Sequence, residues 1–279
     1  AERQFELQIE RTVDGETQII RLTLNIQDIE LERNFLTLGS GVGFHQHDKS
    51  DYRPQDLPSE FAKTILGSTY WDSPEDKPLT LIWSIELGEV PQFFIANIEH
   101  LTAKSQQSIK IQAHIDLVRQ LIEHANRQIE EVANIKFIEV GIDPLTGQTA
   151  DLNFWFVEHI ENFSGFAFYP SSRASNIFLQ ASTLATVTTL KNFPYPLIEG
   201  LRKIYLHEIG HALGLSHPFE QIGEWPGHEK YRNSQGTLMS YSQAINSHGL
   251  KMADIEALQW LYGAPGEHGT GAEFLPVIT

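Results

Sequence analysis

The chain has 279 residues, no cysteine and a formal net charge of −16 at pH 7. Such acidity disfavours nucleic acid or an anionic membrane as a partner, because both attract basic surfaces, and no apolar run approaches the roughly 18 residues needed to cross a bilayer. With 41% hydrophobic and 20% charged residues and no internal repeat, the composition predicts a soluble globular protein with one sizeable core or two modest domains.

The N-terminal part predicts a β-hairpin followed by a connector. Apolar and polar residues alternate from Phe5 to Ile9 and again from Ile20 to Ile26, and the turn signal Asp14-Gly15 stands between the two runs. Residues 39–58 are rich in Gly, Asp and Pro and follow neither the helical nor the strand period. We therefore treat residues 1–55 as a β-rich extension or pro-segment.

The next part of the chain predicts helices alternating with strands. Ser59–Asp72 indicates a short helix that ends at Gly67. Residues 106–133 carry apolar side chains mostly three or four positions apart, which predicts a long amphipathic helix lying against a sheet. Three strands are predicted from alternating or apolar runs, at Leu79–Leu87, Ile135–Val140 and Asp151–Val157.

Two further segments, Ser164–Ser172 and Ser175–Gln180, follow these strands. An edge strand there would offer unpaired N–H and C=O groups, so that an extended peptide could add to the sheet as an extra strand. Ser175–Gln180 can equally be an interior strand without a ligand, and the residues alone leave both possibilities open.

A helix that begins near Leu197, after Pro194 and Pro196, leads into the segment HEIGHALGLSH, residues 207–217. Apolar residues at offsets of three and four face its core side. They are Leu201, Ile204 and Tyr205.

The spacing of the histidines in this segment predicts a metal site. His207 and His211 are four positions apart, so on a helix they lie about 40° apart on one face and one turn along the axis, close enough to share a metal. His217 can reach the same ion only if the helix breaks after Leu213. Gly214 stands where a helix needs a left-handed residue to stop, which is the conformation that glycine tolerates best.

The composition of the segment predicts catalysis. Three protein ligands leave one coordination position open, which is typical of a catalytic rather than a structural zinc. Glu208, beside the first ligand, is placed to take a proton from a water bound to the metal. The alternative is a helix with solvent-facing histidines. The five fixed positions of HExxHxxGxxH, in a chain with 12 His and 20 Gly, weigh against it.

Two features follow the histidine segment. Thr237–Tyr241 reads TLMSY and contains Met239, one of only two methionines in the chain. The last predicted helix, Ala253–Tyr262, stops at Gly263 and turns Ile255, Leu258 and Leu261 inward.

These motifs resemble those of the metzincin metallopeptidases, whose extended zinc motif is followed by a methionine turn. The MSY form is similar to the serralysin and astacin branches, and the latter depend on disulfides, which this chain cannot form. His217-Pro218 and MADIEALQWLYGA at Met252–Ala264 are similar to serralysins. The resemblance covers residues 58–264, strongly after residue 200. The glycine-rich calcium-binding repeats of serralysins are missing, which is a departure from that family.

The resemblance implies an α+β fold of the metzincin zinc-protease type. We expect a twisted mixed sheet packed on long helices, an active-site helix, a mostly helical or irregular C-terminal subdomain, and the N-terminal hairpin as an extension. The implied division is an extension at residues 1–55, a catalytic domain at 56–264 and a tail at 265–279.

The implied activity is that of a secreted zinc endopeptidase that acts as a monomer on polypeptide substrates. His207, His211 and His217 would hold Zn²⁺ and Glu208 would be the general base. Tyr241 would be a movable fifth ligand that hydrogen-bonds the oxyanion, or only a packing residue of the turn. The family is exported by a bacterial type I route, and Glu273–Thr279 is either an export tail or a plain terminus.

The N-terminal part leaves two further alternatives open. His45, His47 and Asp48, in the sequence FHQHD, could cap the catalytic metal and keep the enzyme latent, or could lie in a solvated loop. A binding module on a metzincin scaffold, with its cleft blocked by the N-terminal segment, is the competing function. The retained Glu208 weighs against it, because a silenced site has no need of its base.

Overall fold

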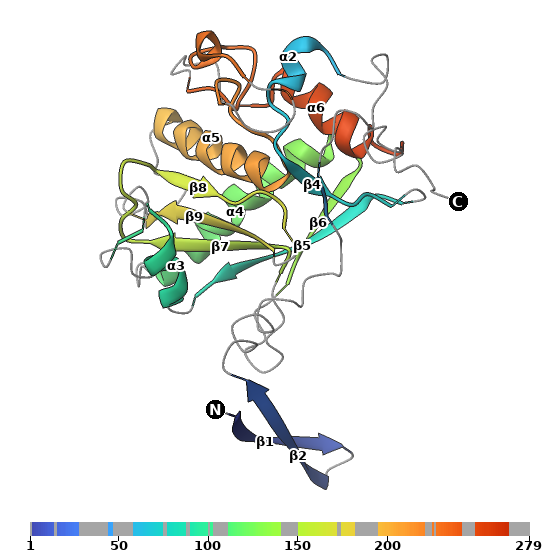
Figure 1. Cartoon of the computed structure of the whole chain (residues 1–279), viewed down its shortest axis with the longest axis vertical. Helices are drawn as coiled ribbons and strands as arrows, with labels where there is room; N and C mark the ends of the chain where they lie inside the picture. The colour runs from blue at the N-terminus through green and yellow to red at the C-terminus, as the bar shows by residue number, and fades with distance from the viewer. Residues whose placement is uncertain are drawn as a thin grey trace.

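The computed structural model describes residues 2–13, 16–27, 44–46, 58–74, 77–87, 90–99, 101–102, 111–140, 150–171, 174–181, 195–220, 225, 227–241 and 249–267. A five-stranded sheet forms the centre of the part that carries the predicted metal site (Figure 1). Its strands are β5 (Leu79–Glu86), β6 (Ile135–Glu139), β7 (Leu152–Val157), β8 (Gly165–Ala167) and β9 (Ser175–Gln180).

The strand order is β6-β5-β7-β9-β8, and β8 alone runs antiparallel to its neighbour. The prediction of a mixed sheet is confirmed, and so are the three strands predicted from alternating or apolar runs, which are β5, β6 and β7. Ser175–Gln180 lies between β7 and β8, so the interior reading of this segment is confirmed, and β8 forms the border of the sheet next to it.

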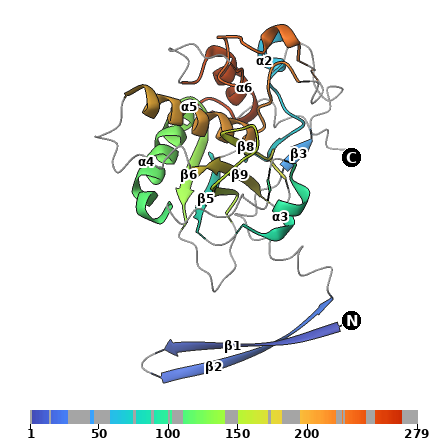
Figure 2. The ribbon, with the colours of Figure 1, turned by 90° about the vertical axis from the view of Figure 1, so that its left-hand side faces the viewer.

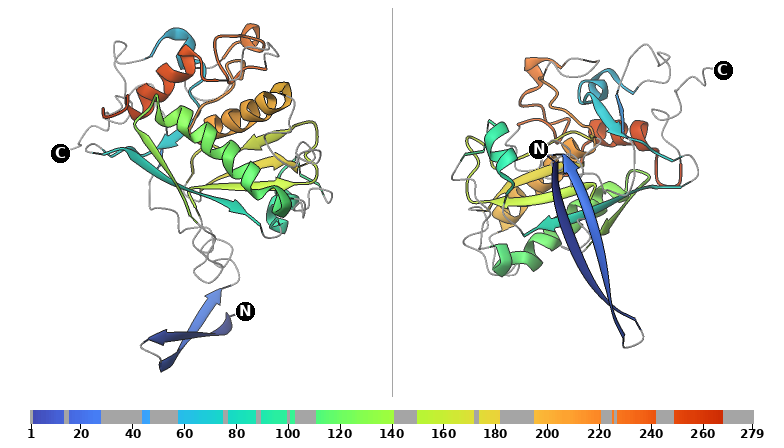
Figure 3. Two further views of the ribbon diagram at one scale, coloured as in Figure 1. Left: turned by 180° about the vertical axis from the view of Figure 1, so that it is seen from behind. Right: turned by 60° about the horizontal axis from the view of Figure 1, so that its bottom comes forward.

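Apolar side chains cover both faces of the sheet. Phe154 and Phe156 of β7 pack in the core shared with α4 (Ile111–Glu130) and α5 (Tyr195–Ala212). Trp155 and Val157 point to the opposite face and pack against Phe94 of α3 (Gln92–Asn97). Because successive side chains of a strand alternate between faces, β7 is buried along its whole length. Figures 2 and 3 show α4 and α5 together on one side of the sheet.

The helix predicted from Ser59 to Gly67 is shorter than expected. Helix α2 (Glu60–Lys63) has only four residues, and Thr69–Trp71 forms strand β4. Leu66 makes an isolated antiparallel bridge with Leu215, and the Gly67 N–H donates a hydrogen bond to the Gly214 carbonyl at 2.7 Å. These long-range contacts draw the chain out of the helix before Gly67, so the predicted end was wrong.

Helix α6 (Met252–Tyr262) ends where the sequence predicts, at Gly263, whose φ is 82°. Leu258 and Leu261 are fully buried as predicted. Ile255 is only partly buried, because the innermost position at this end of the helix belongs to Asp254, which is also fully buried. The inward position predicted for Ile255 was therefore wrong, and a polar residue takes it.

The predicted N-terminal hairpin is confirmed: β1 (Glu2–Val13) pairs with β2 (Glu16–Gln27) in a two-stranded sheet of its own. Within the predicted connector, Phe44–Gln46 forms strand β3, which pairs antiparallel with β4 so that His45 lies opposite Tyr70. The rest of that connector up to residue 57, with His47 and Asp48, lies outside the described residues, as do residues 268–279. None of the described helices is both long enough and apolar enough to cross a bilayer.

Candidate metal centre

The first two histidines are delivered by the last turns of α5. Leu201 and Tyr205 are buried in the core as predicted, and Ile204 packs against this core. Helix α5 also contacts β8. His207, Glu208 and His211 are 8%, 6% and 7% exposed. A metal held there would thus be shielded from bulk water on the protein side.

The helix ends in the left-handed turn that the sequence predicts. The Gly214 N–H donates to the His211 carbonyl and the Leu215 N–H donates to the Gly210 carbonyl, both at 2.9 Å, which is the hydrogen-bond pattern of a Schellman motif. Gly214 has a φ of 91°, and a Cβ atom added to it would lie 2.5 Å from the Thr69 carbonyl oxygen. Both the backbone angle and the neighbouring strand therefore require glycine.

This turn brings the third histidine back to the first two. The Nε2 atom of His217 lies 3.1 Å from Nε2 of His207 and 3.1 Å from Nε2 of His211. The three potential ligand atoms all lie within 4.8 Å of one another. The structure thus brings together the three residues that the spacing predicts.

The opposite nitrogen of each ring is held by an acceptor. Nδ1 of His207 lies 3.1 Å from the Leu238 carbonyl oxygen, and Nδ1 of His211 lies 2.7 Å from the Leu215 carbonyl oxygen. Nδ1 of His217 lies 2.6 Å from the Glu220 carboxylate. Since carbonyl and carboxylate oxygens only accept, each Nδ1 carries the proton and each Nε2 is left with a lone pair.

Burial keeps the two helix rings, those of His207 and His211, neutral. Burial lowers the pKa of His207 to about 3, aided by the neighbouring His217, and burial likewise lowers the pKa of His211 well below its ordinary value. Three lone pairs that face one another without a proton between them repel, and a cation among them removes that repulsion. Imidazole nitrogens suit zinc, so the donor set fits the predicted metal.

Glu208 lies beside this cluster with an unused oxygen. Its Oε2 atom is buried and has no hydrogen-bond partner among the described residues, and burial raises its pKa to about 8. A Cβ atom added to Gly165 of β8 would lie 3.1 Å from the Glu208 carboxylate, so the sheet border passes directly over it. An unpartnered buried oxygen at this place fits a group that binds a water molecule during a reaction.

Met239 lies in a tight turn under the metal cluster. Met239 is fully buried. A Cβ atom added to Gly210 would lie 2.8 Å from the Met239 sulfur, so the absence of a side chain at Gly210 makes room for the thioether. The turn is held by Asp254, whose carboxylate accepts hydrogen bonds from the Thr237 hydroxyl, the Leu238 N–H at 2.8 Å and the Lys251 N–H at 2.7 Å. Sequence reasoning missed Asp254, which no spacing relates to the histidines.

Tyr241 lies on the open side of the cluster. Its ring centre is 4.9 Å from that of His217 and 6.4 Å from that of His207, and the residue is 39% exposed. Burial, together with the carboxylates of Glu220 and Glu208, raises its pKa, so the phenol is protonated at neutral pH. The predicted residue is thus next to the metal ligands.

Three more side chains surround the ligands and were not predicted. Phe219 stacks on the His217 ring, with centres 5.0 Å apart and planes 10° apart, and the Arg232 guanidinium lies 4.1 Å above Phe219. Tyr169, which follows β8, meets the His211 ring edge to face at 5.8 Å. Only Phe219 has a local signal, since it lies two positions after the end of the histidine segment.

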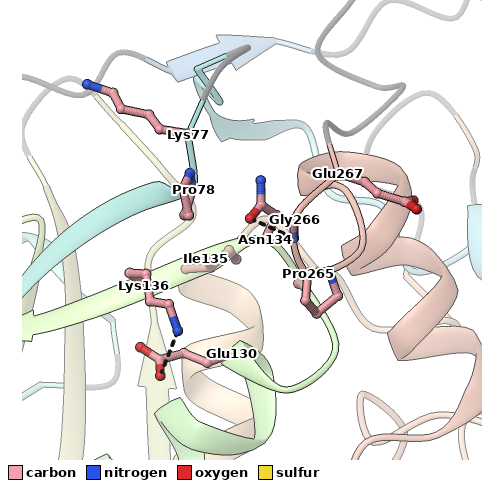
Figure 4. Close-up of a pocket in the computed structure, with 10 residues that line it drawn as sticks. Lys77, Pro78, Glu130, Asn134, Ile135, Lys136, Pro265, Gly266 and Glu267 are labelled. Atoms are coloured by element: carbon pink, nitrogen blue, oxygen red, sulfur yellow. Dashed lines mark hydrogen bonds and ion pairs between the residues drawn. The ribbon is translucent and has the colours of Figure 1, made fainter.

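A separate cavity of about 270 Å³ lies where β5 and β6 begin, beside the end of α6. Figure 4 shows its lining, in which Lys136 pairs with Glu130 and Asn134 accepts a hydrogen bond from the Gly266 N–H. No residue of the metal cluster lines it. We therefore place the candidate site at the histidines.

Known proteins provide an independent comparison. No family model matches the chain. Among solved structures, the chain is similar to one from the GM1-bound form of the ECX AB5 holotoxin, with 13% identity, a TM-score of 0.40 and coverage of 77% of this chain and 95% of that one. It is also similar to the structure of myroilysin, with 12% identity, a TM-score of 0.39 and coverage of 68% and 95%.

The sequence relatives are serralysins. Serralysin B of Dickeya chrysanthemi is 43% identical over 88 residues, covering 25% of this chain and 18% of that protein. Serralysin of Proteus mirabilis is 28% identical over 174 residues, covering 53% and 35%. Serralysin A of Dickeya chrysanthemi is 34% identical over 159 residues, covering 50% and 32%. The chain spans about a third or less of the length of these relatives. These partial matches relate segments of the chain to serralysins.

Proposed function

We propose that this chain is a secreted zinc endopeptidase with a metzincin fold of the serralysin branch. In this proposal residues 56–264 form the catalytic domain, between the extension 1–55 and the tail 265–279. One observation carries it: three imidazole lone pairs converge beside the buried and unpartnered carboxylate oxygen of Glu208.

The chain's own residues prepare the metal site. His207, His211 and His217 would hold the ion through Nε2, and the acceptors at each Nδ1 fix the ring orientations before it binds. Zinc bound there supplies a Lewis acid, which lowers the pKa of a bound water and polarises a substrate carbonyl.

Glu208 handles the proton. Its Oε2 accepts a proton from the attacking water and then returns it to the nitrogen of the leaving amine. Burial raises the proton affinity of this carboxylate, which suits a group that must both accept and release a proton near neutral pH.

Tyr241 stabilises the reaction's negative charge. Its protonated phenol can donate a hydrogen bond to the carbonyl oxygen as that oxygen becomes an anion. Because the donor is useful only at that stage, it should raise turnover more than substrate binding.

The border strand β8 suits an extended peptide as substrate. The hydrogen bonds Gln180 N–H to Ser164 carbonyl and Phe168 N–H to Asn176 carbonyl direct every second residue of this segment toward β9. In an antiparallel ladder the residues between them, Gly165 and Ala167, direct their N–H and C=O groups outward. A peptide paired there would pass over Glu208, which lies next to Gly165.

The test is cleavage of an unfolded protein by the full chain loaded with zinc. We expect internal fragments by mass spectrometry, loss of activity with a chelator and its return with zinc. E208Q should keep its zinc and lose about a thousandfold or more in kcat, because the proton acceptor is gone while the ligands remain. A matched control is E139Q, which changes a carboxylate on β6 that pairs with Arg119 and contacts none of the three histidines.

A second variant tests whether the N-terminal segment blocks the site and keeps the enzyme inactive. A chain that begins at residue 44 keeps β3 and its pairing with β4. Cleavage only after this shortening would indicate that residues 1–43 block the site. Absence of cleavage by both forms, and by the shortened form with alanine at His45, His47 and Asp48, each with one bound zinc, would defeat the endopeptidase proposal in favour of a binding module.

A further inference from the structure

The third histidine is held differently from the other two. His207 and His211 belong to one helix, and their Nδ1 atoms face backbone carbonyl oxygens. His217 lies beyond the helix end, and its Nδ1 faces the carboxylate of Glu220 at 2.6 Å. Among the described residues, Glu220 is therefore the one charged side chain that hydrogen-bonds to a member of the cluster.

The backbone holds Glu220 at this place. The Gly227 N–H donates to the Glu220 carbonyl and the His228 N–H donates to the Pro218 carbonyl, both at 2.8 Å. A Cβ atom added to Gly227 would lie 2.3 Å from the Pro218 carbonyl oxygen, so the two segments touch closely. The backbone of the turn from His217 to Glu220 is thus held by hydrogen bonds from Gly227 and His228, which fixes the position of the Glu220 backbone.

The guanidinium of Arg232 directs its hydrogen bonds to another carboxylate. Arg232 lies over the Phe219 ring, but its Nε and Nη2 atoms donate to the two carboxylate oxygens of Glu229 at 2.5 and 3.0 Å. Glu220 is left to His217, and Phe219 covers one face of the same imidazole. Hydrogen bond and stacked ring together leave the His217 ring one orientation.

We propose that Glu220 is a positioning residue for the metal: it fixes the His217 ring and supplies a negative charge that strengthens zinc binding. The inference rests on the metal site of the proposed function. A carboxylate on the outer nitrogen makes an imidazole a more basic ligand and partly offsets the charge of the dication in a buried site. The two neutral carbonyl partners of the helix histidines supply no such charge.

The test measures zinc affinity of the full chain by competition with a chromogenic chelator at fixed pH. E220A should bind zinc about 10- to 100-fold more weakly. E220Q, whose amide oxygen can still accept from Nδ1 but carries no charge, should fall between E220A and the unchanged chain. E139A is the matched control, since Glu139 has the same side-chain exposure of 32%, is ion-paired to Arg119 and lies on β6.

A second readout separates positioning from general stability. The melting temperatures of the metal-free forms should agree, while the Co²⁺ absorption bands of E220A should shift because His217 is no longer fixed. Zinc binding by E220A as tight as by E139A would overturn the proposal, and E220Q equal to the unchanged chain would overturn the part played by charge. Neither readout requires peptide cleavage, so a chain that binds zinc but cuts nothing would defeat only the proposed function.

Discussion

The buried carboxylate of Asp254 accepts a hydrogen bond from the backbone N–H of Leu238, and the carbonyl of the same Leu238 faces Nδ1 of His207. Helix α6 is thereby connected through a single residue to His207, a candidate metal ligand on α5. The ends of these helices are joined again at Tyr262, whose hydroxyl donates to the Leu213 carbonyl at 2.7 Å. The methionine turn is thus held between two helices.

Replacing Asp254 should destabilise the protein. In D254A the hydroxyl of Thr237 and the N–H groups of Leu238 and Lys251 lose their acceptor inside the protein, so we expect a loss of about 3 kcal/mol in the free energy of unfolding. Urea unfolding of the metal-free chain measures it. D116A, at an exposed carboxylate of α4, should change stability by less than about 0.5 kcal/mol. Equal effects of the two variants would contradict this role.

Two glycines of the α5 segment should respond in opposite directions to alanine. G214A forces a side chain into a left-handed position and against the Thr69 carbonyl, so it should cost more than about 2 kcal/mol and weaken zinc binding. Gly200 lies inside the helix with free space around an added Cβ, so G200A should stabilise by about 0.5–1 kcal/mol. Thermal unfolding followed by circular dichroism distinguishes them, and a neutral G214A would refute the predicted turn.

Gly165 should control the position of the base. In G165A the new methyl group would meet the Glu208 carboxylate at 3.1 Å and the Leu179 side chain at 3.0 Å, so one of them must move. We expect kcat to fall about tenfold, since small displacements of a catalytic group are costly, while zinc content stays at one per chain. Steady-state kinetics with a peptide substrate and metal analysis measure the two effects. An unchanged kcat would show that Leu179 moves instead.

The Tyr241 hydroxyl should act in turnover. Y241F keeps the ring contacts with His217 and Phe219 and removes only the donor, so kcat should fall about 100-fold with little change in KM or in zinc affinity. Y231F is the control, because Tyr231 packs against Phe61 and His228 and makes no ring contact with His207, His211 or His217. If kcat fell equally in Y241F and Y231F, or if Y241F kept full kcat, Tyr241 would be only a packing residue.

Much of the site could be predicted because its rules are local. The spacing of His207 and His211 depends only on the helical repeat, and the left-handed backbone angle at the end of the helix was enough to predict Gly214. The strands of the sheet follow from alternation and apolar runs, and α6 ends at a glycine for the same local reason as α5. The methionine turn that contains Met239 was expected from the resemblance.

Other features depend on partners that the sequence does not identify. The shortening of α2 comes from the bridge between Leu66 and Leu215, nearly 150 positions away in the chain. Asp254 took an inward position on α6 because its carboxylate meets the donors of a turn on another segment. Neither the bridge nor the turn leaves a periodic pattern that could have predicted it.

The sequence by itself determined that three imidazoles and one carboxylate stand at spacings suited to zinc chemistry, since helical geometry relates residues only a few positions apart. Only the tertiary structure decided that the Leu238 carbonyl faces the His207 ring, 31 positions away in the chain, and that β8 borders Glu208. These contacts satisfy buried polar groups with whichever partner the packed helices and strands bring within reach, and that choice is made by the whole fold.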